Sequence, residues 1–182
     1  MILWINGAHG AGKTSVARRI AALRTDALLF DPEQIGFMLR RLLPEVAALP
    51  DFKDHPLWRE LTVRLLAEAE ATAPALVVVP MTLAHPGHFE DIVGGLRAAG
   101  TELRHFTLTA SPATLRRRLA RRLDWPSSRR WALARVEPCA AALEADAFAE
   151  HVPTEGRSVA AIADDILERA AAPRLAPHAA LC

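Results

Sequence analysis

Met1-Ile-Leu-Trp-Ile-Asn-Gly-Ala-His-Gly-Ala-Gly-Lys-Thr-Ser-Val16 opens the chain and predicts its fold. The apolar run 2–5 has the length and composition of a short strand buried on both faces of a parallel sheet. After it, Val16, Ile20 and Leu23 recur at helical spacing. Between strand and helix stands Gly7-x-x-x-x-Gly12-Lys13-Thr14, the phosphate-binding loop pattern, in the context that the pattern requires. A chance glycine-rich turn is the alternative, and this context argues against it.

The chemistry of this loop suits a nucleoside triphosphate. Glycines let backbone N–H groups turn inward, and the following helix adds its positive end, so a polyphosphate is favoured. Lys13 is predicted to reach the β- and γ-phosphates, and the Thr14 hydroxyl to ligate Mg²⁺. We therefore expect ATP and Mg²⁺ as cofactors. His9 occupies a variable position of the pattern and is assigned no separate role. The expected nucleotide-binding residues are Gly7, Ala8, His9, Gly10, Ala11, Gly12, Lys13, Thr14 and Ser15.

Length and composition indicate one folded domain. The chain has 182 residues, of which 51% are apolar and 24% charged, enough for a proper hydrophobic core. A net charge of +1 gives no overall basic field, so nucleic acid is not an expected partner. Cys139 and Cys182 form neither a disulfide framework nor metal-ligand spacing, which fits a reducing cytoplasm. We find no secretory signal and no apolar run that would span a bilayer. The expected location is cytoplasmic, as a monomer or a homodimer.

Apolar segments alternate with helical patterns along the rest of the chain. Strands are expected near 27–30, 75–79, 102–109 and 148–152, and helices near 32–43, 56–72, 87–98, 112–123, 129–145 and 158–171. This alternation predicts right-handed βαβ crossovers and hence an α/β fold, a P-loop NTPase with a five-stranded parallel sheet and helices on both faces. We expect one kinase-like domain over 1–172 and a tail over 173–182. Ligands of such sheets lie beyond the carboxyl ends of the strands.

The residues that accompany the loop narrow the class of nucleotide protein. A hydrolytic motor ATPase usually has an acid at the end of an apolar strand, but the strand 75–79 runs into Pro80-Met81-Thr82. A guanine-specific switch protein would need an Asn-Lys-x-Asp signature, which the chain lacks. What remains is Asp31 after the second strand and an arginine-dense helix followed by a Pro/Ser loop. This combination is typical of small-molecule and nucleoside kinases.

Asp31 and the arginines are the candidate catalytic groups besides Lys13. Asp31 is predicted to orient or deprotonate the acceptor hydroxyl, and its other reading, a plain helix N-cap, is compatible with that role. Arg118 and Arg122 lie four residues apart among packing leucines, so one helix face carries two guanidiniums suited to phosphate. A merely solvated helical face is the alternative. We expect an arginine-rich lid over about 116–130, whose loop 124–130 closes over the phosphates and excludes water.

The acceptor pocket is expected in the stretch 31–60, between the second and third strands. Phe37 and Trp58 are predicted to stack on a planar ring or a sugar face, although both also fit ordinary core positions. The expected substrate residues are Phe37, Arg40, Arg41, Trp58, Arg59, Met81, Thr82 and His85. A zinc site at His85 and His88 is rejected because further ligands are missing nearby.

Several motifs resemble one family, the tunicamycin-resistance ATP-binding proteins. The resemblance rests on the phosphate loop with Asp31-Pro-Glu-x-x-Gly-Phe37, Pro56-Leu-Trp-Arg59, Val79-Pro-Met-Thr82 and His85-Pro86. His105-Phe-Thr-Leu108, Ala110-Ser111 and the Leu115, Arg118, Leu119, Arg122 spacing extend it to about residue 169. It implies a nucleotide-kinase-like fold and resistance to tunicamycin, a uridine-containing nucleoside antibiotic. For some members it also implies a membrane-associated C-terminal extension, so we expect at most a peripheral membrane association.

Three functions stay open at this point. In the first, an ATP-dependent phosphotransferase phosphorylates a hydroxyl of tunicamycin, with Asp31 as the base and Arg118 and Arg122 in the lid. In the second, an ATP-dependent protein binds and sequesters the drug without transfer. In the third, the same kinase chemistry acts on a nucleoside or sugar metabolite.

Overall fold

A computed structural model of the chain describes residues 1–72, 75–122 and 125–172. Within these residues, five strands form one parallel sheet in the order β2-β3-β1-β4-β5. The strands are β1 (Ile2–Gly7), β2 (Ala27–Leu29), β3 (Leu76–Pro80), β4 (Leu103–Thr109) and β5 (His151–Pro153). The first strand therefore lies at the centre of the sheet, where the chain reverses its direction of winding.

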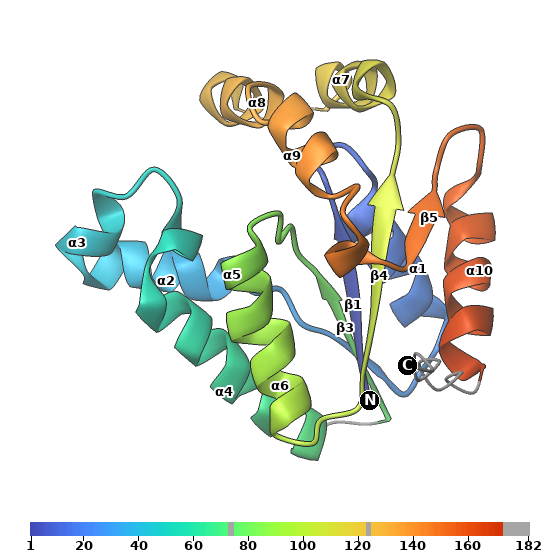
Figure 1. Cartoon of the computed structure of the whole chain (residues 1–182), viewed down its shortest axis with the longest axis horizontal. Helices are drawn as coiled ribbons and strands as arrows, with labels where there is room; N and C mark the ends of the chain where they lie inside the picture. The colour runs from blue at the N-terminus through green and yellow to red at the C-terminus, as the bar shows by residue number, and fades with distance from the viewer. Residues whose placement is uncertain (73–74, 123–124, 173–182) are drawn as a thin grey trace, which may run out of the picture.

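Helices follow the strands along the chain. They are α1 (Lys13–Leu23), α2 (Glu33–Leu42), α3 (Pro44–Ala47), α4 (Pro56–Thr72), α5 (Pro86–Phe89), α6 (Gly95–Ala98), α7 (Pro112–Ala120), α8 (Pro126–Leu133), α9 (Val136–Ala142) and α10 (Val159–Ala171). The π-helical turn η2 (Glu90–Gly94) joins α5 to α6, and η1 (Phe52–Asp54) and η3 (Asp146–Phe148) are short 3-10 helices. Helices α1 and α10 cover one face of the sheet, and α4 to α6 cover the other (Figure 1).

The centre of the sheet is the centre of the hydrophobic core. Every residue of β1 is buried, and so is every residue of β3. Ile2 pairs with Val77 on one side and with Leu103 on the other, so both neighbours of β1 run parallel to it in register. A strand covered on both faces must be apolar throughout, which explains why the run 2–5 contains no polar residue.

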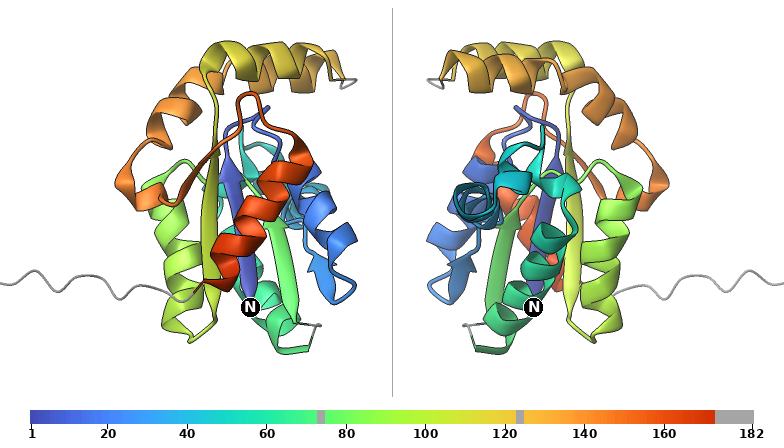
Figure 2. Two further views of the ribbon diagram at one scale, coloured as in Figure 1. Left: turned by 90° about the vertical axis from the view of Figure 1, so that its right-hand side faces the viewer. Right: turned by 90° about the vertical axis from the view of Figure 1, so that its left-hand side faces the viewer.

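The carboxyl ends of β1, β3, β4 and β5 open at the same edge of the sheet. Helices α7 and α8 lie across this edge rather than along a face of the sheet (Figure 2). The chain after β1 and the chain after β5 meet beneath them. Residues far apart in the sequence are therefore brought together at the edge where parallel α/β sheets bind ligands.

The predicted fold class is confirmed, with differences in detail. The expected helix 129–145 is two helices, because Pro138 lacks an N–H and its ring would clash with the carbonyl of residue 134 in a continuous helix. The expected loop 124–130 is helical from Pro126 onward, and residue 124 lies outside the described residues. The stretch 44–55, between two expected helices, contains α3 and η1. The last strand is His151–Pro153, since Phe148 is buried in η3.

Side-chain hydrogen bonds and one glycine mark the ends of several helices. Ser111 accepts from the Thr114 N–H at the start of α7, and Ser158 accepts from the Ala161 N–H at the start of α10. Gly100 follows α6 with φ of 81°, in the left-handed region that ends helices. In the described ranges, none of the helices combines the length and the apolarity that a membrane crossing demands.

Candidate active site

The phosphate loop connects β1 directly to the N-terminus of α1. Gly7, Gly10 and Gly12 all have positive φ, at 140°, 87° and 101°. A Cβ on Gly7 would lie 2.7 Å from the carbonyl oxygen of Leu108, and one on Gly10 would lie 2.8 Å from that of Leu115. Glycine is therefore required both for the turn and for close packing against β4 and α7. The loop is thereby held with the N-terminus of α1 at its end, the geometry of an anion site.

Asn6 anchors this loop to the segment that follows β3. Its buried side chain accepts from the N–H groups of Gly7 (2.8 Å) and Leu83 (2.9 Å), and its amide donates to the Leu83 carbonyl oxygen (2.9 Å). The Thr82 hydroxyl adds a buried hydrogen bond to the carbonyl oxygen of Gly7 at 2.8 Å. The polar residue at the end of β1 thus serves the loop conformation, because it satisfies three backbone groups that would otherwise be buried without partners.

Lys13 is folded back over the loop that it follows. Its Nζ donates to the carbonyl oxygens of Gly7 and Ala8, at 2.9 and 3.1 Å. Burial lowers the pKa of Lys13 to about 8, while the nearby Glu33 carboxylate acts in the opposite direction. A buried ammonium of this kind is poised for an anionic partner, since a phosphate would restore the charge balance.

Two carboxylates from the start of α2 face the same cleft. Asp31 and Glu33 line it together with the phosphate loop, and its volume is about 600 Å³. Asp31 accepts from the Glu33 N–H at 3.0 Å and from the Gln34 side chain at 3.4 Å, so it binds the first turn of α2, although the N-cap position is Pro32. Although Glu33 as a residue is exposed, withdrawal of its carboxyl from water and the neighbouring Asp31 raise the pKa of Glu33. In the sequence, Glu33 stands out only as part of the Asp31-Pro-Glu motif.

Arg118 reaches the phosphate loop from α7. Its guanidinium donates to the hydroxyl and to the carbonyl oxygen of Thr154, both at 2.9 Å, and lies 3.5 Å from the carbonyl oxygens of Gly10 and Ala11. Thr154 is fully buried after β5 and donates to the Thr109 carbonyl oxygen. Arg122 lines the same cleft. Both predicted lid arginines therefore stand beside the loop, and Thr154 is a supporting residue that no sequence pattern indicated.

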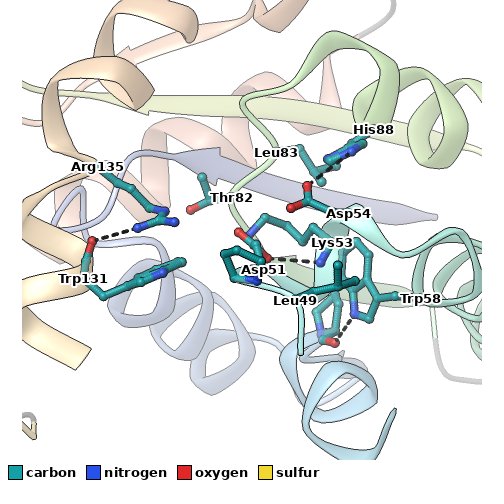
Figure 3. Close-up of polar contacts among 12 residues, drawn as sticks. Leu49, Asp51, Lys53, Asp54, Trp58, Thr82, Leu83, His88, Trp131 and Arg135 are labelled. Atoms are coloured by element: carbon teal, nitrogen blue, oxygen red, sulfur yellow. Dashed lines mark hydrogen bonds and ion pairs between the residues drawn. The ribbon is translucent and has the colours of Figure 1, made fainter. Parts of the chain in front are cut away.

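Several of the residues predicted to bind the acceptor lie elsewhere than in an acceptor pocket. Trp58 is fully buried, and its indole N–H donates to the Pro32 carbonyl oxygen at 3.1 Å, so no face of it is available for stacking (Figure 3). Met81 is buried as well, and the Thr82 hydroxyl donates to the carbonyl oxygen of Gly7. His85 caps α5 through its Nδ1. We correct the expectation for Trp58 and Met81, because burial leaves neither side chain accessible to a ligand. Thr82 lines the cleft and His85 is exposed, so their contact with an acceptor stays a prediction.

The predicted acceptor arginines also hold the protein chain together. Arg40 donates to the carbonyl oxygens of Leu49 and Pro50, at 3.0 and 3.2 Å. Arg59 pairs with Asp91 at 2.8 Å and donates to the Lys53 carbonyl oxygen at 2.6 Å. They shape the segment between α3 and α4 by bonding its carbonyl groups.

Phe37 and Arg41 remain at the surface of α2. Phe37 is 47% exposed and packs edge-on against Phe52, and Arg41 is exposed in the last turn of the helix. Of the predicted substrate residues, Phe37 is the aromatic one that keeps accessible surface. The acceptor set predicted from the sequence is therefore not gathered into one cleft.

The site fits a nucleotide with its magnesium ion. Gly7 and Gly10 leave no room for side chains, Lys13 and Arg118 supply positive charge, and the Thr14 side chain lines the cleft. The described residues contain no group of three or more His, Cys, Asp or Glu able to hold a metal by themselves. Mg²⁺ commonly keeps several waters and uses few protein ligands beside phosphates, so a single threonine is enough.

Comparison with known proteins agrees with this geometry. The sequence matches the AAA domain family over residues 2–145. The chain belongs to this family. No curated protein sequence matches this chain significantly.

Three solved structures illustrate the likeness. A tunicamycin resistance protein from Deinococcus radiodurans is 27% identical, with a TM-score of 0.79 over 97% of this chain and 98% of that one. A gluconokinase from Sinorhizobium meliloti is 20% identical, with a TM-score of 0.65 over 93% and 90%. A shikimate kinase from Bacteroides thetaiotaomicron is 16% identical, with a TM-score of 0.62 over 93% and 97%. The kinase-like P-loop fold and the predicted resemblance to tunicamycin-resistance proteins are confirmed.

Proposed function

We propose that this chain is an ATP-dependent phosphotransferase that acts on a hydroxyl group of a small molecule. The observation that carries the proposal is the single cleft shared by the phosphate loop, the two carboxylates of α2 and the two arginines of the α7 segment. Phosphoryl transfer needs a donor cradle, a group to handle the acceptor proton and positive charge on the transferring phosphoryl group. Each of these has a candidate in the cleft.

The proposed roles follow from the contacts. The N–H groups of the loop and Lys13 hold the triphosphate, and bound Mg²⁺ beside Thr14 neutralises its charge. The acceptor oxygen forms a bond to the γ-phosphorus while the bond to the bridging oxygen breaks and leaves ADP. Asp31 takes the proton from the acceptor hydroxyl. Arg118 is held by Thr154, so it is oriented toward the loop before any ligand binds.

Tunicamycin is the acceptor to test first. The similarity to the Deinococcus radiodurans tunicamycin resistance protein supports it, and the resemblance in the sequence motifs points the same way. The experiment is mass spectrometry of tunicamycin incubated with this protein and Mg-ATP. A mass increase of one phosphoryl group establishes transfer to the drug. Unmodified drug bound in stoichiometric amount establishes sequestration instead and contradicts transfer to it.

A pair of matched variants tests the role of Asp31. Asp31→Asn removes the proposed base and keeps the size of the side chain, and we expect a loss of transfer of about 10²-fold or more. Asp26→Asn is the control, since Asp26 is exposed before β2 and pairs with Arg24 far from the chemistry. If Asp31→Asn retained full transfer and undiminished ATP affinity, the proposed mechanism would be wrong.

A further inference from the structure

Four side chains form a cluster beside the phosphate loop that the proposed mechanism does not use. Asp51 and Lys53 come from the η1 region, between α3 and α4, whereas Trp131 lies in α8 and Arg135 is the N-cap residue of α9. In Figure 3 the Arg135 guanidinium and the Asp51–Lys53 pair lie on opposite sides of the view, and the charge of Arg135 acts on the Asp51 carboxyl. The cluster therefore joins the expected acceptor region to the segment beyond the lid.

The two residues of the α8 side hold a cation in a fixed orientation. The Arg135 guanidinium carbon lies 4.0 Å from the centre of the Trp131 ring. Its only hydrogen bond within the described chain is a long one, 3.4 Å from Nη1 to the Trp131 carbonyl oxygen. The described residues offer it no salt bridge with a carboxylate. Stacking on an aromatic ring positions a guanidinium without using its N–H groups, so most of these donors remain available.

The η1 side contributes a second cation, which is already paired with a carboxylate. Lys53 Nζ lies 2.7 Å from Asp51 Oδ2, and the Lys53 N–H donates to Asp51 Oδ1 at 3.1 Å. Burial would raise the pKa of Asp51, but the charge and hydrogen bonds of Lys53 hold that pKa below its ordinary value. The same ammonium lies 5.4 Å from the Phe52 ring and 5.9 Å from the Trp131 ring. Both oxygens of Asp51 are engaged, whereas the ammonium retains free donors.

The cluster adjoins the phosphate loop through His9. The His9 and Trp131 rings meet edge to face with centres 5.0 Å apart. Burial lowers the pKa of His9 to about 3, and the charges of Lys13 and Lys53 act in the same direction. His9 is therefore neutral near pH 7 and adds no positive charge of its own. The charge and hydrogen-bond donors of the cluster come from Lys53 and Arg135.

We propose that Lys53, Trp131 and Arg135 form an acceptor subsite that binds an anionic oxygen group, a carboxylate or a phosphate, carried by the molecule to be phosphorylated. Calling the ligand an acceptor rests on the proposed function. Donors exceed acceptors in the cluster, so its complement is a group with several acceptor oxygens, and guanidinium binds such groups in a bidentate way. An anionic sugar or nucleoside metabolite meets this requirement, whereas an uncharged nucleoside offers only carbonyl and hydroxyl oxygens.

The test is an NMR titration of the full chain saturated with Mg²⁺ and a non-hydrolysable ATP analogue, so that the phosphate loop is already filled. The reporter is the Trp131 indole N–H, one of four tryptophan signals in this 182-residue protein, assigned with Trp131→Phe. The probes are methyl phosphate and acetate, with uncharged acetamide as the matched control. We expect a saturable shift with an anion and none with acetamide. A shift with methyl phosphate alone indicates an acceptor that carries a phosphate. A shift with acetate alone indicates an acceptor that carries a carboxylate.

Variants connect the shift to the proposed residues. Arg135→Met and, in a separate variant, Lys53→Met should each weaken anion binding by about tenfold, because each removes one charged hydrogen-bond partner. Arg64→Met, which removes an exposed charge of α4 outside the cluster and outside the lid, should leave the affinity unchanged. Unshifted signals of the buried Trp4 and Trp58 confirm that each variant is folded.

The proposal is overturned if no anion moves the Trp131 signal, if acetamide moves it equally, or if both Met variants bind like the unaltered protein. The titration involves no phosphoryl transfer. A negative result therefore leaves the transfer mechanism intact, and failure of transfer to tunicamycin leaves the subsite intact.

Discussion

Replacing Asn6 by alanine should destabilise the protein strongly although Asn6 touches no substrate. The change removes all three hydrogen bonds of the side chain and leaves the Gly7 N–H, the Leu83 N–H and the Leu83 carbonyl buried without partners. At about 1 to 2 kcal/mol for each unsatisfied group, the loss is about 3 to 6 kcal/mol. A domain has about 5 to 15 kcal/mol of total stability, so this is a large fraction.

Thr82→Val is the matched control for this prediction. It removes one hydrogen bond to the Gly7 carbonyl oxygen, which still accepts from Lys13 Nζ at 2.9 Å, so no buried group loses its last partner. The expected loss is about 1 kcal/mol.

Urea unfolding followed by tryptophan fluorescence measures both losses, because Trp4 and Trp58 are fully buried in the folded state. The free energy of unfolding should fall several times further for Asn6→Ala than for Thr82→Val. A loss below about 1 kcal/mol for Asn6→Ala, or equal losses for the two variants, would refute the argument that unsatisfied backbone groups dominate.

Three further predictions follow from the site and its supports. The pKa of Lys13 is about 8 in the free protein, and a bound phosphate favours its charged form, so ATP affinity should fall as pH rises above about 8. Calorimetry in buffers of different ionisation enthalpy should then detect proton uptake on ATP binding. A pH-independent affinity would contradict this prediction. Gly36→Ala places a Cβ 2.5 Å from the Phe52 ring and should lower the free energy of unfolding, measured by thermal unfolding, by about 1 to 3 kcal/mol. Gly95→Ala is the control: its Cβ would have its nearest neighbour at 3.8 Å, so it should stabilise the helix slightly. Arg118→Met should weaken ATP binding by about 10- to 100-fold in a fluorescence titration, and unchanged affinity would remove Arg118 from the donor site.

Much of the fold was predictable because the signals are local. The strand–loop–helix order around Gly7–Thr14, the apolar runs and the caps at Ser111 and Ser158 each depend on residues that are neighbours in the chain. The helix boundary at residue 134 was also encoded locally, in Pro138, although the helical pattern over 129–145 predicted one helix. These features follow from backbone hydrogen bonding and periodicity, which short stretches express without help from the rest of the chain.

The donor side of the site was predictable for the same reason, and the acceptor side was not. Trp58 sits at helical spacing that suits either a core or a ligand position, and only packing shows that its indole is bonded to Pro32. The positive charge of Arg40 and Arg59 suggests ligand binding when only the sequence is known, yet both side chains donate to nearby carbonyl groups. A polar side chain's partner is decided by which chain segment lies within reach, and spacing along the sequence does not specify that.

By itself, then, the sequence determined that this protein folds as a parallel α/β domain around a phosphate loop after its first strand, because that loop is a contiguous motif with its own geometry. The tertiary structure alone decided that Asn6 and Thr82 hold the loop in place, that Thr154 orients Arg118, and that Lys53 and Arg135 both lie over Trp131. These contacts join residues dozens of positions apart. They form only when the strand order and the packing of α7 to α9 bring separate segments to one edge of the sheet.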